Sequence, residues 1–251
     1  MYDAWLDLVL GSRCGVCGHP GRILCRLCAS ALPGSAHVAW PTPCPPGLVL
    51  PVAAGEYDGG LKILVNAHKE RQQFSLVDPL GVMLARCVEG VLDYQHLAPA
   101  TPCFLVPVPS RSPVVRARGH DPMLRVSRRA AGLLRRRGHL VVVMRLLKST
   151  APVHDQAGLN ARERAANLLA TMTCSTSSAA RLRTRFPEAR FVVADDVLTT
   201  GATAREAQRA LEACDLAVAG VATIAATRRL LPLPTDREDS RGSLSLSHRE
   251  D

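Results

Sequence analysis

One stretch constrains the fold of this chain more than any other. It is residues 191–214, which read FVVADDVLTTGATAREAQRALEAC. The first four residues are apolar, which predicts a buried strand. Two acids, Asp195 and Asp196, follow this strand, and a turn rich in small and hydroxyl residues leads from them into a segment with apolar residues at helical spacing. The stretch therefore predicts a strand, a turn and a helix within an α/β sheet.

These features together are typical of a site for a phosphorylated sugar. The backbone N–H groups of the turn and the positive end of the helix dipole can hold a phosphate. Three threonines, Thr199, Thr200 and Thr203, can add hydroxyl donors, and the two aspartates can accept hydrogen bonds from ribose hydroxyls. The alternative is an ordinary strand–turn–helix unit whose acids only cap the helix. A cap needs one acid or hydroxyl, however, and not two acids and three threonines.

The motif VVADDVLTTGAT closely resembles the phosphoribosyl pyrophosphate (PRPP) signature of type I phosphoribosyltransferases. The resemblance implies an open, mostly parallel sheet flanked by helices, with Asp195 and Asp196 as the catalytic pair and Mg²⁺ bound together with PRPP. It further implies a pyrophosphate-binding turn after the first core strand, in the place that Val106 to Ser110 occupy here. The PRPP contacts implied are Thr199, Thr200, Gly201, Ala202, Thr203, Val108, Pro109 and Ser110.

Four of the nine cysteines form two Cys-x-x-Cys pairs, Cys14 with Cys17 and Cys25 with Cys28. Such a pair turns both sulfurs toward one centre, and two pairs complete a tetrahedral thiolate shell for Zn²⁺. A shell of four thiolates is closed, so the zinc would be structural. Redox dithiol chemistry and an iron–sulfur cluster are the alternatives, but a redox protein rarely needs two such pairs so close together.

Composition predicts four parts of the chain. Residues 1–32 hold a short amphipathic helix and the cysteine module, and residues 33–51 contain six prolines, which predict a linker without regular structure. Residues 52–229 form the phosphoribosyltransferase-like domain, and the polar tail 230–251 should be disordered. Within the main domain we expect an edge strand at 52–56, further strands at 103–106, 140–144 and 217–225, helices at about 61–69, 76–91 and after 121, a lid at 147–167 and a connector at 175–180.

The net charge of +9 suggests a polyanionic partner or a phosphorylated substrate. Much of the excess lies in residues 111–148, where Asp121 is the one acid. These arginines could follow the phosphates of single-stranded DNA, or they could form a solvated cationic face. The stretch lacks the interleaved aromatic residues of a base-stacking surface. The candidate nucleic-acid contacts are Arg118, Arg128, Arg129, Arg135 and Arg136.

The first ten residues carry two acids and no basic segment, so we expect no signal peptide. No apolar stretch has the length of a membrane span, and we therefore expect a cytoplasmic protein without membrane insertion.

The order of the motifs is similar to that of the ComF family, competence-associated proteins with a zinc-finger head on a phosphoribosyltransferase domain. The resemblance covers about residues 10–228. At His120-Asp121-Pro122 the chain departs from the Phe-Asn-Gln that the family usually has after Arg-Gly. The matching positions are the four paired cysteines; Tyr57, Gly59 or Gly60, and Lys62; Val106 to Pro109; Arg118-Gly119; Gln156, Leu159, Arg164 and Asn167; and Asp195 to Thr203.

Two kinds of function follow from this resemblance. One is the transfer or sensing of a phosphoribosyl group from PRPP with Mg²⁺, linked to DNA uptake. The other is a non-catalytic adaptor of the DNA-uptake machinery that binds single-stranded DNA through the basic face. Expected partners are PRPP or a related phosphosugar, single-stranded DNA, DNA-uptake proteins and a second copy of the chain, while the acceptor substrate is not legible.

Overall fold

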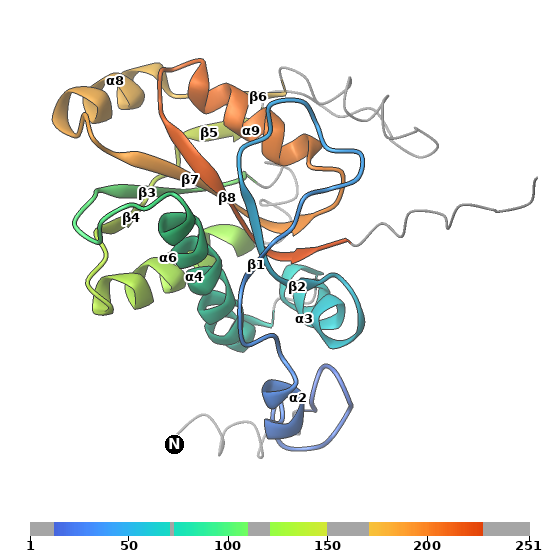
Figure 1. The fold of residues 1–251 in the computed structure, drawn as a ribbon. Helices are drawn as coiled ribbons and strands as arrows, with labels where there is room; N and C mark the ends of the chain where they lie inside the picture. The colour runs from blue at the N-terminus through green and yellow to red at the C-terminus, as the bar shows by residue number, and fades with distance from the viewer. Residues whose placement is uncertain (1–12, 71–72, 110–120, 150–170, 228–251) are drawn as a thin grey trace, which may run out of the picture.

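The structure is a computed structural model that describes residues 13–70, 73–109, 121–149 and 171–227. Its centre is a six-stranded sheet with the order β1-β2-β8-β7-β3-β4 (Figure 1). Neighbouring strands are parallel except for β1 and β2, so this is the open, mostly parallel α/β sheet that the sequence predicts. The strands are β1 (His37–Val38), β2 (Pro51–Glu56), β3 (Cys103–Pro107), β4 (Val141–Val143), β7 (Arg190–Leu198) and β8 (Val218–Ala226).

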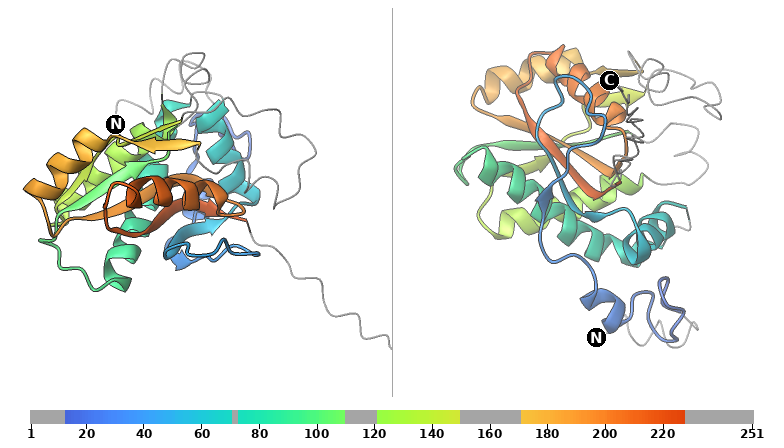
Figure 2. Two further views of the ribbon diagram at one scale, coloured as in Figure 1. Left: turned by 90° about the horizontal axis from the view of Figure 1, so that it is seen from above. Right: turned by 45° about the vertical axis from the view of Figure 1, so that its right-hand side comes forward.

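Helices cover both faces of this sheet (Figures 1 and 2). The helices α4 (Val77–Tyr94) and α6 (Pro122–Arg136) lie on one face, and α8 (Thr176–Arg185) and α9 (Ala202–Glu212) lie on the other. A separate antiparallel pair, β5 (Leu147–Ser149) and β6 (Met172–Cys174), lies on the α9 side. The remaining elements are α2 (Arg26–Ser30), α3 (Gly59–Glu70) and the short η1 (Phe74–Leu76). In the part of the chain that the structure describes, no helix combines the length and apolarity that crossing a bilayer requires.

The central strands are buried on both faces, because successive side chains of a strand point to opposite sides. In β7, Val192 and Ala194 belong to the core beneath α4 and α6, whereas Phe191 and Val193 belong to the core beneath α8 and α9. This explains why the strand reads as a continuous apolar run rather than as an alternating pattern.

The connections of β3 and β7 leave the sheet in opposite directions. The chain runs from β3 through α6 to β4 on one side, and from β7 through α9 to β8 on the other. Since β3 and β7 are neighbours and their helices lie on opposite faces, the carboxyl ends of these two strands form a topological switch point. Open α/β sheets bind ligands in the crevice at such a point.

The proline-rich segment 33–51 is more ordered than the sequence predicts. It contains β1, which pairs with β2, so β2 is an inner strand and not the predicted edge strand. Farther along, the segment is bound to α9 (Figures 1 and 2): Arg205 Nε donates to Pro46 O at 3.0 Å, and the Gln208 amide bonds to Gly47 O and Val49 N at 2.9 and 3.0 Å. These side chains of α9 fix a segment whose prolines cannot donate to a strand ladder.

One prediction about a connector is wrong, and several others fall on residues that the structure does not describe. The stretch 175–180, predicted as a connector, begins helix α8, which is anchored by the buried side chains Ala179 and Leu182. Most of the predicted lid at 147–167 lies outside the described residues, as do the amino-terminal helix and the tail after residue 227. Of the lid, only β5 is described.

The packing of β8 against α4 predicts a stability difference between two glycine substitutions. A Cβ atom on Gly220 would lie 2.7 Å from Val91 Cγ1 and 2.8 Å from Leu50 O. We expect Gly220→Ala to destabilise the fold by about 1–3 kcal/mol, because the backbone oxygen cannot move aside. Thermal melting should show a decrease of roughly 2–4 °C for each kcal/mol.

The matched control is Gly132→Ala in α6, where the nearest atom to an added Cβ is Arg135 Nη2 at 4.0 Å. This variant should gain about 0.5–1 kcal/mol from helix propensity. Equal melting temperatures for the two variants would contradict the packing argument.

Candidate functional site

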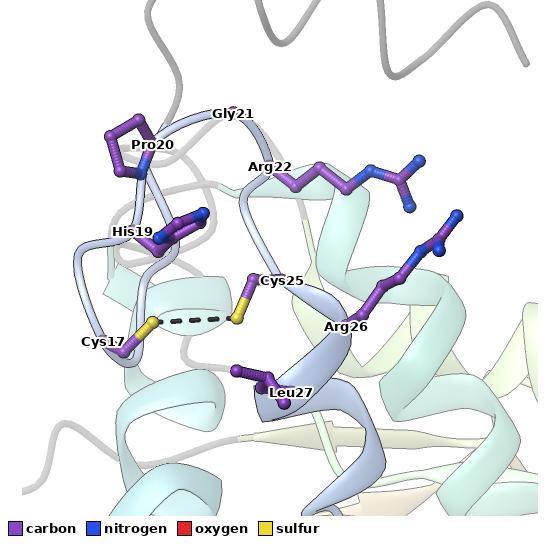
Figure 3. Close-up of a pocket in the computed structure, with 8 residues that line it drawn as sticks. All are labelled: Cys17, His19, Pro20, Gly21, Arg22, Cys25, Arg26 and Leu27. Atoms are coloured by element: carbon purple, nitrogen blue, oxygen red, sulfur yellow. Dashed lines mark hydrogen bonds between the residues drawn. The ribbon is translucent and has the colours of Figure 1, made fainter.

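Four cysteine sulfurs of the amino-terminal module converge on one point. The sulfurs all lie within 4.8 Å of one another, and Cys17 Sγ is 3.7 Å from Cys25 Sγ (Figure 3). On a tetrahedron with 2.3 Å zinc–sulfur bonds, two sulfurs are about 3.8 Å apart. The arrangement can therefore hold a structural metal ion through Cys14, Cys17, Cys25 and Cys28, as the sequence predicts.

The local backbone explains why these sulfurs meet. Gly18 and Gly21 have φ angles of 74° and 112°, in the left-handed region that glycine adopts readily. The amide of Cys25 lies 3.5 Å from Cys14 Sγ, and the amide of Cys28 lies 3.5 Å from Cys25 Sγ. The Cys25 N–H group points at Cys14 Sγ and favours its thiolate form.

The thiols also influence one another. Burial raises the pKa of Cys14, but backbone N–H groups, that of Cys25 first, outweigh burial and lower this pKa to about 6. Burial and hydrogen bonds with the other three thiols raise the pKa of Cys28 to about 12. Four sulfurs at this distance cannot all ionise unless a cation lies between them, which fits a divalent metal with four thiolate ligands.

The acidic pair lies inside strand β7 and not beyond its end. The sequence predicts a strand that stops before Asp195, but β7 continues to Leu198, and Asp195 is in register with Thr223 of β8. Asp195 is only 8% exposed, and its Oδ1 accepts a hydrogen bond from the Asp196 amide at 2.9 Å. Asp195 is therefore a buried residue of the strand, whereas the sequence predicts that it follows the strand.

A lysine that no motif marks in the sequence completes the acidic pair. Lys69 Nζ lies 2.7 Å from Asp196 Oδ2. The lysine belongs to the last turn of α3, where the helix dipole favours a cation. Burial lowers the pKa of Lys69, but the charge of Asp196 and its hydrogen bond outweigh this effect and raise the pKa above its usual value. The one feature of the sequence that could have indicated Lys69 is its place as a basic residue at the end of a predicted helix.

Among the described residues, Asp195 has no ion-pair partner of its own. Burial raises the pKa of Asp195 to about 8, and the negative charge of Asp196 acts in the same direction. The Asp196 amide and the charge of Lys69 lower this pKa, but only in part. At neutral pH Asp195 thus favours its protonated form, and a ligand that brings positive charge would favour its ionisation.

The loop from β7 into α9 presents backbone N–H groups. Gly201 has a φ of 73°, and the Ala202 amide donates to Thr200 Oγ1 at 3.4 Å. Among the described residues, the N–H groups of Thr200, Gly201 and Thr203 have no hydrogen-bond acceptor. These groups lie at the amino end of α9, so they can bind an anion.

The proline-rich segment forms a wall of this loop. A Cβ atom on Gly201 would lie 3.0 Å from Pro41 Cγ and 3.2 Å from both Pro45 Cδ and Leu48 Cδ2. Glycine is required here by the left-handed backbone and by this close approach.

The predicted pyrophosphate turn after β3 lies at the same switch point. The Val108 amide donates to Ala194 O at 2.8 Å, and the flanking residues Pro107 and Pro109 have no N–H group. Within the described residues of this turn, no backbone N–H is therefore free. Any contact between this turn and an anion through backbone amides falls on Ser110 and its successors, which lie outside the described residues.

The four predicted nucleic-acid contacts that the structure describes divide into two groups. Arg129 Nε pairs with Asp78 Oδ1 at 2.6 Å, and Arg135 Nη1 donates to Val141 O at 2.8 Å. Arg128 and Arg136 are exposed on α6 and have no ion pair with a described residue. Arg118 lies outside the described residues, so two of the five candidates remain available on the described surface.

No model of a known protein family matches this chain, and no curated protein is significantly similar to it. The candidate site therefore rests on its own geometry. The chain has an α/β open sheet with a four-cysteine cluster, and an acidic pair with Lys69 beside a loop whose backbone N–H groups can bind an anion.

The raised pKa of Asp195 predicts a pH-dependent stability. The pKa of this carboxyl is about 8 in the folded protein, against its ordinary value of 3.8 in the unfolded chain. Between these values only the folded state keeps the proton, so the contribution to stability falls as the pH rises from about 4 to about 8. Asp195→Asn cannot ionise, so its melting temperature should rise relative to wild type across this window.

Scanning fluorimetry between pH 5 and 9, without added divalent cations, measures this difference. The matched control is Asp93→Asn, which changes an exposed acid on α4. A difference between Asp195→Asn and wild type that stays constant with pH would refute the assignment.

Proposed function

We propose that this chain binds a ribose that carries phosphate groups, PRPP in particular, at the carboxyl ends of β7 and β3. The observation that supports this most strongly is that the acidic pair and the 199–203 loop follow one another in the chain, at the switch point of the sheet. The loop suits an anion, and the acids suit hydroxyl groups. A ligand that carries both within a few ångströms is a sugar phosphate.

The residues would divide this ligand between them. The free N–H groups of the loop and the hydroxyls of Thr199, Thr200 and Thr203 would bind the 5′-phosphate. Gly201 and Ala202 would contribute backbone contacts. Asp195 and Asp196 would accept hydrogen bonds from the 2′- and 3′-hydroxyls and fix the ring.

The resemblance to type I phosphoribosyltransferases suggests the reaction. An acceptor would displace pyrophosphate from C1 of PRPP through a transition state with positive charge on the ring, next to the two carboxylates. Mg²⁺ bound with the ligand would supply positive charge against the leaving pyrophosphate. A sensor would use the same contacts without transfer, and pyrophosphate release distinguishes the two. The resemblance to the ComF family suggests a link to DNA uptake.

For the cysteine cluster we propose Zn²⁺. Four thiolates fill its tetrahedral shell, so the metal would be structural. It would fix the module whose side chains Val16, Ile23 and Leu24 pack against the core that contains α3.

Single-stranded DNA binding by the basic face is the second proposal. It is supported by Arg128 and Arg136, which are exposed on α6, but two further arginines are engaged within the fold. If these two residues contact phosphates, Arg128→Glu with Arg136→Glu should flatten the salt dependence of binding.

Calorimetric titration with PRPP and Mg²⁺ tests the sugar-phosphate site. Thr200→Val keeps the side-chain shape but removes a hydroxyl donor, so it should weaken binding by about 1–3 kcal/mol. Asp196→Asn should also weaken binding, because it removes the charge that faces the ribose. Thr184→Val, an exposed threonine of α8, is the matched control and should bind as wild type does. A wild-type protein that gives no heat at millimolar PRPP would rule the site out.

Elemental analysis tests the metal. The purified wild-type chain should contain one zinc, and Cys25→Ser should lose it together with much of its thermal stability, because binding energy is folding energy in such modules. Cys44→Ser, an exposed cysteine outside the cluster, should keep the full zinc content. Protein that is stable and free of zinc would contradict the assignment.

A further inference from the structure

The ammonium group of Lys69 occupies the position beside Asp196 that a ligand would need. Lys69 Nζ lies 2.7 Å from Asp196 Oδ2, and the two side chains are 40% and 16% exposed. The carboxylate is thus nearly covered, while the lysine side chain reaches it from the solvent side. A flexible lysine in such a position can leave without unfolding the strand that bears the acid.

The position of Lys69 is set by the end of helix α3. The preceding residue, His68, is buried, with Nδ1 3.3 Å from Gln73 O and Nε2 3.4 Å from Pro122 O. These contacts hold the last turn of α3 against the residues that follow it and against the start of α6. By contrast, Lys62 of the same helix lies 5.7 Å from the ring centre of Tyr57, away from the acidic pair.

Three acids act on this single ammonium group. Asp196 acts most strongly, through its charge and a hydrogen bond, and Asp195 and Glu70 add their charges. In the described residues, Lys69 is the cation within ion-pair distance of Asp196. It neutralises a carboxylate that would otherwise be both poorly solvated and next to a second acid.

We propose that Lys69 is a tethered counter-cation that competes with the divalent cation accompanying the sugar phosphate. It holds Asp196 in the ligand-free protein and releases this carboxylate when the ligand binds. The identity of the ligand rests on the proposed function; the competition rests on the ion pair. One carboxylate cannot keep an ammonium group and a divalent cation at the same oxygen, because the two positive charges repel each other.

This role makes Lys69 a specificity-determining residue. A neutral sugar brings no positive charge to replace the ammonium group, so it leaves the ion pair in place. A sugar phosphate with its own divalent cation offers Asp196 a stronger partner, and its phosphate oxygens offer Lys69 a new one. The site thereby favours ligands that arrive with a metal ion.

The test is the binding of Mn²⁺ alone to the full zinc-loaded chain, followed by electron paramagnetic resonance. Lys69→Met removes the competitor and should bind Mn²⁺ at least about tenfold more tightly than wild type. Lys69→Arg keeps the charge and should behave as wild type does. Lys62→Met is the matched control and should leave the affinity unchanged. Adding Asp196→Asn to Lys69→Met should abolish the gain, which places the Mn²⁺ at Asp196.

An affinity of Lys69→Met equal to or weaker than that of wild type, or no Mn²⁺ binding by either, overturns the proposal. Melting curves identify a variant that fails to fold, and Lys69→Gln then serves as the second neutral variant. Calorimetry with PRPP separates this proposal from the proposed function. A gain in Mn²⁺ affinity without PRPP binding supports the counter-cation role and refutes PRPP as the ligand. PRPP binding without the gain supports the proposed function and refutes the counter-cation role.

Discussion

Strand β7 holds the acidic pair and the loop that follows it in place. It is hydrogen-bonded to β3 on one side and to β8 on the other, and helices cover both of its faces. A strand in this position cannot leave the ladder without burying unpaired N–H and C=O groups. Asp195 and Asp196 belong to the paired part of the strand, and the 199–203 loop starts directly after it. The acids and the 199–203 loop therefore have fixed positions relative to each other.

Burying two adjacent carboxylates in such a strand is unfavourable unless their charges are compensated. The fold compensates them differently. Asp195 has a pKa raised by burial to about 8 and so favours its proton, while Asp196 is paired with Lys69. Both arrangements are suited to change when a ligand brings a divalent cation to the acids, since that cation would favour ionised Asp195 and replace Lys69. The electrostatics that stabilise the acidic pair thus also bear on what the site would bind.

The amino-terminal part of the chain takes part in the site through packing. Pro41 and Pro45 press against the position of Gly201, and the cysteine module packs through Val16 on the core that includes α3. Since α3 carries Lys69, the four-cysteine module supports the helix whose lysine pairs with Asp196. The segment 33–51 connects the cysteine module to the main domain, and it also packs against the loop that follows β7.

The sequence by itself determined the parts with strong local patterns. The run 191–203, the strands at β3 and β8 and the paired cysteines are legible because apolar runs, turn residues and Cys-x-x-Cys spacing act over a few residues. Helix α8 was not legible, because it is polar apart from two buried side chains. The partnership of Lys69 with Asp196 was decided only by the tertiary structure. These residues are far apart in the chain, and they meet because β8 alone separates β2, which leads into α3, from β7 in the sheet order.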